Sequence, residues 1–206
     1  FALEEPVKDG TRRSIQFFDE GGTAVHKIYA RAGTDLAAWE ALVEAFRAQD
    51  QSDSFTPAPV ADKHAARPDD AVDLSGLRAA WGALEDVHDF FGMLKDFGVA
   101  REQAFRLVAA PFATRVRPAS VRQVLERASA QAAPIMVFVG NPGCIQIHTG
   151  PVKNVKPMGP WINVMDPEFN LHLRQDMVAE AWIVKKPTVD GMVTSLETFD
   201  AHGELI

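Results

Sequence analysis

The sequence predicts an α+β fold in which helices pack on an antiparallel β-sheet meander, with an internal pseudo-repeat. Three observations predict it. Apolar residues at helical spacing dominate the middle of the chain, short alternating segments dominate its last third, and its first and last segments resemble each other. The 206 residues are 47% hydrophobic and 24% charged, a composition typical of a globular protein of one or two domains.

The internal repeat is visible without a gap. Residues 6–25 align with residues 187–206 at a constant offset of 181, and seven of the twenty paired positions are identical. Each copy predicts a strand that ends in a Phe-Asp-x-x-Gly turn and continues as a second strand. We therefore interpret the two copies as the closing pieces of two related halves.

The predicted first half spans residues 1–47 and ends in a helix. Thr34 has the side chain of a helix N-cap. The apolar face of the helix is formed by Leu36, Trp39, Leu42, Val43 and Phe46. Residues 48–73 are rich in Pro, Asp, Ser and Ala, so we expect a linker between the halves there.

The predicted second half, residues 74–206, begins with helices. A single amphipathic helix is expected from Leu74 to a stop signal at Gly98. Its apolar face is formed by Leu77, Trp81, Leu84, Val87, Phe91 and Leu94. A second helix is expected over about 101–109, and a third from Pro118, which suits a first helical turn, to about 130.

Alternating segments then predict the strands of an antiparallel sheet. They are residues 135–139, 144–149, 161–165, 169–174, 177–184 and 192–199. A Gly-Asn-Pro-Gly sequence at 140–143 predicts a tight turn between the first two. Helices followed by a run of strands indicate the α+β class.

The composition excludes several classes of protein. The net charge of −7 argues against general nucleic-acid binding, although six arginines and only two glutamates between residues 101 and 127 could dock a small anion. The longest apolar runs are too short to cross a bilayer, and the single Cys144 cannot form a disulfide framework. We expect a soluble, cytoplasmic protein without an export signal and without stable membrane insertion. Signatures of nucleotide-binding proteins, common hydrolases and zinc enzymes are absent from the sequence.

Among six histidines, His88 has the most informative surroundings. The helical pattern places it beside Val87 and the Phe90–Phe91 pair, one turn after Leu84. A partly buried imidazole needs a partner there, because an unpaired polar group costs about 1–3 kcal/mol. Two interpretations follow from the residues: a core-edge histidine bonded to Glu85 or a backbone carbonyl, or the ligand of a planar, metal-bearing cofactor with acidic tails, such as haem.

Several segments together resemble the HemS/ChuS family of bacterial cytoplasmic haem-handling proteins. They are residues 86–95 (DVHDFFGMLK), 140–151 (GNPGCIQIHTGP), 158–164 (MGPWINV), 169–174 (FNLHLR) and 179–182 (AEAW). The resemblance covers essentially the whole chain. Proteins of this family consist of two homologous halves, in agreement with the repeat. The resemblance identifies the chain as the end of a first half and most of a second.

The resemblance also implies a haem site. It implies that His88 is the axial ligand of the iron of haem b and that Leu84 touches the porphyrin face. The other imidazole nitrogen needs an acceptor, for which Glu85 or a backbone carbonyl is the candidate. Arg101 and Lys186 match basic positions that hold the haem propionates. The opposing arginine of the family is expected ahead of residue 1, and further residues over the propionates beyond residue 206.

The function implied by the resemblance is haem binding in bacterial haem uptake and iron acquisition. Haem, received from an importer, would be passed to a haem oxygenase or opened to release its iron. No catalytic residue is assigned, and the resemblance leaves carrier and oxygenase-like enzyme open. The alternative from another class is a noncatalytic sheet-based interaction module that binds no haem. A hydrolase is a weaker alternative, since the sequence shows no nucleophile and base at a recognisable spacing.

Overall fold

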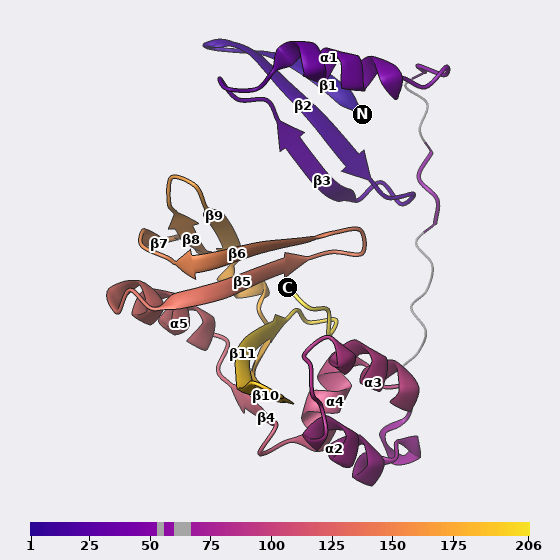
Figure 1. Ribbon diagram of the computed structural model, residues 1–206, viewed down its shortest axis with the longest axis vertical. Helices are drawn as coiled ribbons and strands as arrows, with labels where there is room; N and C mark the ends of the chain where they lie inside the picture. The colour runs from indigo at the N-terminus through magenta and orange to yellow at the C-terminus, as the bar shows by residue number, and fades with distance from the viewer. Residues whose placement is uncertain (53–55, 60–66) are drawn as a thin grey trace. The chain divides into compact units, whose positions relative to one another are not determined.

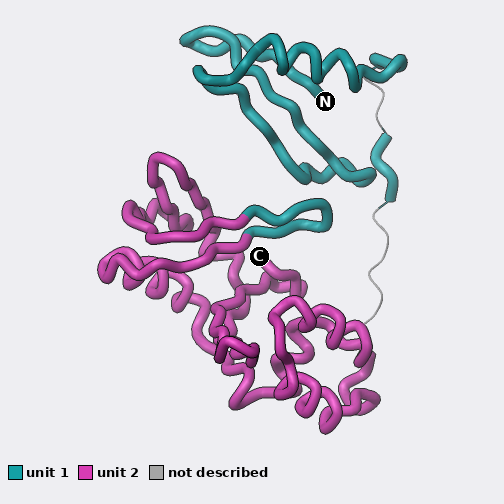
Figure 2. Tube along the Cα trace, in the orientation of Figure 1, with its two compact units in different colours: residues 1–63, 139–146 teal, residues 64–138, 147–206 magenta. Residues whose placement is uncertain are grey.

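The computed structural model describes residues 1–52, 56–59 and 67–206 and divides into two compact units. One comprises residues 1–63 with 139–146, the other residues 64–138 with 147–206 (Figure 2). The division falls within the expected linker 48–73, part of which lies outside the described residues. Residues 139–146, expected in the second half, group with the first unit. None of the helices in the described residues is long and apolar enough to span a membrane.

The N-terminal part of the first unit is a three-stranded antiparallel sheet with one helix beside it (Figure 1). Its elements are β1 (Ala2–Val7), β2 (Gly10–Phe18), β3 (Ala24–Tyr29) and α1 (Leu36–Ala45). Asp35, and not Thr34 as predicted, is the N-cap of α1: its carboxylate accepts the backbone N–H of Ala38 at 3.1 Å. A carboxylate also suits the positive end of the helix dipole. The Thr34 hydroxyl instead accepts the backbone N–H of Arg31.

The long helix predicted from Leu74 is wrong, because the structure has two helices there. They are α2 (Leu74–Gly82) and α3 (Asp89–Phe97). Between them, the Asp86 carboxylate accepts the backbone N–H of His88 at 2.8 Å, which offers the backbone an alternative to the helical hydrogen-bond ladder.

The remaining helices of this region agree with the sequence. Gly98 ends α3 with a φ of 62°, in the left-handed region that favours glycine, so the predicted stop is confirmed. A short 3-10 helix, η1 (Asp69–Ala71), precedes α2, and α4 (Arg101–Val108) follows α3. The start of α4 coincides with the prediction and its end lies one residue earlier.

Helices α2 to α4 pack on the antiparallel sheet β11-β10-β4 around buried aromatic rings. The strands are β4 (Ala113–Val116), β10 (Glu180–Thr188) and β11 (Gly191–Phe199). The Trp81 and Phe90 rings meet edge to face at 4.7 Å, and Phe105 meets Phe199 in the same way at 5.7 Å. The indole N–H of Trp81 donates to the backbone oxygen of Lys185 at 2.9 Å and so ties α2 to β10.

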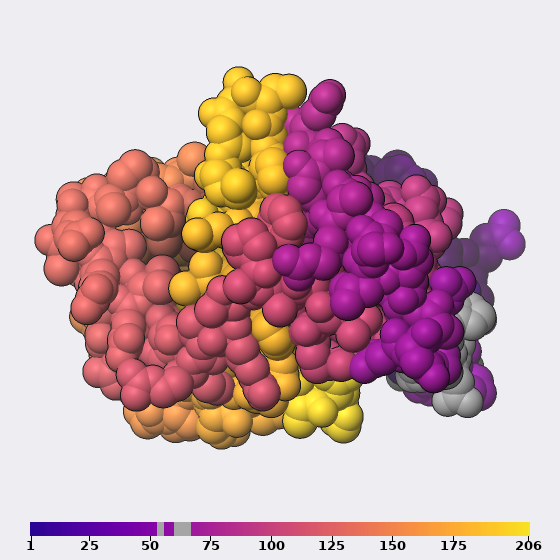
Figure 3. Space-filling model, turned by 90° about the horizontal axis from the view of Figure 1, so that it is seen from below, coloured from indigo at the N-terminus to yellow at the C-terminus, as the bar shows by residue number. Residues whose placement is uncertain are grey.

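A second core lies under α5 (Ser120–Ala130). Buried residues from α5 and from the antiparallel sheet β7-β8-β9 form it, together with Val152 just before β7. The strands are β7 (Val155–Met158), β8 (Trp161–Met165) and β9 (Asn170–Arg174), and the pair β5 (Pro134–Gly140) and β6 (Ile145–Pro151) precedes them. Figure 3 shows β10 and β11, in gold, between the purple helices and the salmon surface of α5. The predicted strand over 177–184 starts late, because η2 (Gln175–Met177) is a 3-10 helix. The predicted α+β class with antiparallel sheets is confirmed.

Both copies of the internal repeat form the same turn. In the first copy the Asp19 carboxylate accepts the backbone N–H of Thr23 at 2.8 Å. In the second, Asp200 accepts the N–H of Glu204 at 2.9 Å. The glycines of the two turns, at positions 22 and 203, have φ values of 85° and 75°. The predicted repeat is therefore a repeat of local structure as well as of sequence.

Replacing Phe105 by alanine should destabilise the second unit by about 3–5 kcal/mol, because a fully buried ring leaves a cavity that its neighbours fill only in part. Denaturant unfolding followed by tryptophan fluorescence measures the loss. The control Val189→Ala removes a side chain that is 78% exposed and should change the free energy of unfolding by less than about 0.5 kcal/mol. Equal losses in both variants would contradict the location of the core.

Candidate functional site

The candidate site begins at His88, the residue immediately before α3. Its side chain is 89% exposed, and its Nδ1 lies 2.6 Å from Oδ1 of Asp86. The backbone and side-chain hydrogen bonds from His88 lower the pKa of Asp86, so this group is a carboxylate at neutral pH. A carboxylate only accepts hydrogen bonds, so Nδ1 carries the proton between them. Nε2 is then the ring nitrogen that can bind a metal.

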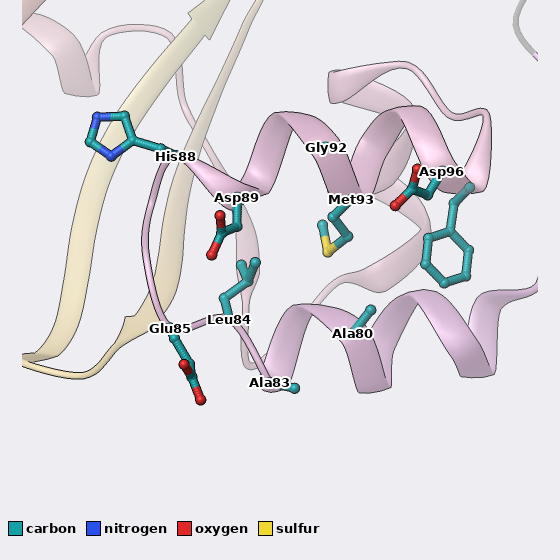
Figure 4. Close-up of a pocket in the computed structure, with 10 residues that line it drawn as sticks. Ala80, Ala83, Leu84, Glu85, His88, Asp89, Gly92, Met93 and Asp96 are labelled. Carbon is teal, nitrogen blue, oxygen red and sulfur yellow. The ribbon is translucent and has the colours of Figure 1, made fainter.

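Two predictions about His88 are wrong. The imidazole does not border the apolar face of a helix, because α2 ends at Gly82 and the following residues leave the helical path. Its hydrogen-bond partner is Asp86 and not Glu85 or a backbone carbonyl. Figure 4 shows the ring pointing away from Leu84 and Met93. The imidazole is therefore presented to solvent.

Leu84 is buried in the core instead of sharing a helical face with His88. It is 8% exposed and lines a pocket of about 610 Å³ (Figure 4). The other lining residues are Ala80, Ala83, Glu85, His88, Asp89, Gly92, Met93, Asp96 and Phe97. Three of them are acidic and none is lysine or arginine, so this pocket disfavours an anionic ligand. Contact of Leu84 with a porphyrin stays a prediction.

Arg101 and Lys186, far apart in sequence, meet on the carboxylate of Glu197. Arg101, the first residue of α4, donates from Nε to Oε2 at 2.6 Å and from Nη2 to Oε1 at 3.1 Å. Lys186 on β10 donates from Nζ to Oε1 at 2.7 Å, and the Ser195 hydroxyl donates to the same oxygen at 3.0 Å. We call Arg101, Lys186 and Glu197 the cation cluster.

The cation cluster is largely buried and carries a net positive charge. The side chains of Arg101, Lys186 and Glu197 are 20%, 9% and 8% exposed. Burial alone would raise the pKa of Glu197, but the hydrogen bonds and charges of Arg101 and Lys186 outweigh it and hold this pKa below its ordinary value. Glu197 is therefore ionised at neutral pH, and two cations with one anion give a formal charge of +1.

Aromatic rings connect the cation cluster to the start of α3. The guanidinium carbon of Arg101 lies 5.1 Å from the ring centre of Phe90 and 5.3 Å from that of Phe91, and Nζ of Lys186 lies 4.7 Å from that of Phe90. Phe90 is buried, whereas Phe91 is 71% exposed. Phe91 lies in the first turn of α3, three residues after His88. Phe90 and Phe91 thus join Arg101 to the first turn of α3, the helix that begins immediately after His88.

Sequence reasoning did not find Asp86 and Glu197. The signal for Asp86 is local: an aspartate two residues before His88 can cap the backbone and hold the imidazole at once. The signal for Glu197 lies in the repeat. Its counterpart in the first copy, 181 residues earlier, is the neutral Gln16, so the charge at this position differs between the two copies. Neither residue carries a motif of its own.

Fold and site define an α+β protein with an internal repeat, whose second unit carries an exposed imidazole at the start of α3 and two cations against the aromatic rings of the same helix. The chain belongs to the family described as the haemin-degrading HemS.ChuX domain, whose family model matches residues 1–46 and 98–206. The resemblance inferred from the sequence is thereby confirmed. The match leaves out residues 47–97, which include His88, Leu84 and Asp86.

Three relatives are similar over the full chain. Holo-PhuS, a haem-binding protein from Pseudomonas aeruginosa, is 47% identical with a TM-score of 0.95, and the match covers 100% of this chain and 59% of that one. ChuS, a haem oxygenase from E. coli, is 42% identical with a TM-score of 0.85, over 100% of this chain and 60% of that one. The hemin transport protein HemS of Yersinia enterocolitica is 44% identical, over 100% of this chain and 59% of the relative. The chain therefore spans about three fifths of each relative.

Glu197→Gln should lower the free energy of unfolding at neutral pH and have little effect in acid. The folded-state pKa of Glu197 lies below the unfolded value of about 4.3, so the ionised carboxylate stabilises the protein above that value. This stabilisation is lost as the pH falls through the folded-state pKa, where the native glutamate is itself neutral. Denaturant unfolding of protein and variant between about pH 7 and pH 3 measures the difference.

The matched control is Glu126→Gln, which removes the partner of Arg122 in an exposed pair at 2.7 Å. It should change stability little at any pH, because exposed ion pairs contribute little. A loss for Glu197→Gln that does not vary with pH would contradict an ionised cation cluster.

Proposed function

We propose that this protein binds haem b in the cytoplasm and serves bacterial haem uptake and iron acquisition. Membership of the HemS.ChuX family supports this, as do relatives that are named a haem-binding protein, a haem oxygenase and a hemin transport protein. The observation within this chain that carries the proposal is the hydrogen bond from Nδ1 of His88 to Asp86, which orients an exposed imidazole with Nε2 available to iron.

His88 supplies the axial nitrogen. Histidines that bind metals generally donate their other N–H to a carboxylate or carbonyl, which fixes the ring and makes the ligating nitrogen more basic. Asp86 has this relation to His88. The exposure of the imidazole allows a haem that arrives from solution to reach it. Iron coordination is thus the role that best fits the pair.

The surroundings of His88 fit a flat apolar ring with acidic substituents. Phe91 exposes 71% of its surface three residues after His88 and offers an aromatic contact for the porphyrin. Arg101 lies over the Phe91 ring, and the cation cluster has a formal charge of +1. We propose that Arg101 and Lys186 receive the propionates, with Arg101 the more accessible of the two.

The fate of the bound haem divides the proposal into two activities. As a carrier, the protein receives haem after import and passes it intact to a haem oxygenase. As an enzyme, it binds and orients the ring while haem iron carries out the oxygen chemistry. Incubating the haem-loaded protein with a reductant in air distinguishes them. Bilin-type products, carbon monoxide and released iron indicate degradation, whereas intact haem recovered on an oxygenase indicates transfer.

His88→Ala should abolish the absorption spectrum of histidine-ligated haem and weaken hemin binding, because it removes the proposed axial nitrogen. Asp86→Asn should weaken binding by about 10–100-fold, since it removes only the carboxylate that orients the ring. A hemin titration of each variant, followed in the Soret region, measures both effects.

His202→Ala is the matched control, because it removes another exposed histidine of the second unit and should leave the titration unchanged. Unaltered hemin binding by His88→Ala would contradict the proposed ligand. No Soret shift with the unmodified protein would instead favour the interaction module that binds no haem.

A further inference from the structure

We propose that Glu197 is a positioning residue for the ligand: its carboxylate holds Arg101 and Lys186 in the arrangement that receives the two carboxylates of haem. The inference rests on the proposed function. It assigns Glu197 no contact with haem, because its two oxygens already accept four hydrogen bonds from Arg101, Lys186 and Ser195.

The hydrogen bonds on Glu197 leave donors for a ligand. Arg101 uses its Nε–H and one N–H of Nη2, and a guanidinium has five N–H groups, so three remain. Lys186 uses one of three N–H groups on Glu197. The planar fork of Arg101 is fixed by two contacts to one carboxylate, so the direction of its remaining donors is fixed as well. A ligand carboxylate thus meets side chains that are already ordered.

Glu197 also makes the close approach of two cations possible. Arg101 and Lys186 both lie near the Phe90 ring. Because both side chains are positively charged, they repel each other. Burial lowers the pKa of Lys186, and the negative charge of Glu197 opposes this effect. With Glu197 ionised, the cation cluster keeps a formal charge of +1, which favours an anionic ligand.

The internal repeat supplies a comparison within the same chain. Gln16 occupies the position of Glu197 in the first copy, is equally buried at 8% exposed, and forms a hydrogen bond with Ser14, the counterpart of Ser195. The counterpart of Lys186 is Glu5. The first copy therefore accommodates a neutral amide at this position where the counterpart of Lys186 is a glutamate. The carboxylate of Glu197 appears in the copy in which the position of Glu5 is a lysine, which supports a role for its charge in holding that lysine.

The test compares hemin with hemin dimethyl ester, which has the same ring and iron but no propionate charge. We expect the protein to bind hemin more tightly than the ester. Glu197→Gln should reduce this preference by about tenfold or more, because the cations lose their shared partner, and should leave binding of the ester nearly unchanged. Soret titrations give both dissociation constants, and thermal unfolding establishes that each variant is folded.

Two further variants separate positioning from stability and from charge. Asp69→Asn removes a carboxylate that binds Arg106 and Gln103 in the same unit, and should leave the preference for hemin unchanged. Glu197→Asp keeps the charge but is one methylene shorter, so it cannot hold both cations in the same geometry and should also lower the preference. It serves as the test if Glu197→Gln does not fold.

The outcomes distinguish this inference from the proposed function. A preference for hemin that Glu197→Gln and Glu197→Asp both retain would overturn the positioning role and leave haem binding intact. Equal binding of hemin and ester by the unmodified protein would show that no cation receives the propionates, which overturns the inference. Absence of binding to either compound would refute the proposed function and this inference together.

Discussion

The site depends on one buried carboxylate. Glu197 brings together an arginine from the start of α4 and a lysine near the end of β10, and it does so against the aromatic core that joins helices to sheet. Removing one partner of such a buried group leaves uncompensated charge, which costs far more than the loss of an exposed ion pair. The same interaction therefore holds α4 to the sheet and concentrates positive charge beside Phe90 and Phe91.

The orientation of the His88 imidazole depends on the break between α2 and α3. In a continuous helix, His88 would be held at the edge of the core; in the loop, Asp86 caps the backbone and binds Nδ1 with a single oxygen. The ring is then exposed but oriented, a combination that suits a ligand acquired from solution. The acidic pocket behind the loop, lined by Leu84 and Asp96, is a poor place for propionates. The chemistry of the site therefore favours the side of α3 that carries Phe91.

Local patterns predicted the parts of the fold that local interactions determine. The stop at Gly98, the start of α4 and the repeated aspartate turns each depend on residues a few positions apart. The break at 83–88 was missed because Leu84 keeps its apolar spacing while packing into the core from a loop. The meeting of Arg101 with Glu197 could not be predicted, since it joins α4 to β11 across 96 residues. Burial of Lys186 likewise follows from tertiary packing and not from its neighbours in sequence.

We propose that this chain holds haem between the imidazole of His88 and the cations on Glu197. A crystal structure of the protein with hemin tests it most directly. We expect iron bound to Nε2 of His88, the ring against Phe91, and a propionate oxygen within hydrogen-bond distance of Arg101 or Lys186. Iron bound to a different side chain, or propionates directed away from both cations, would contradict it.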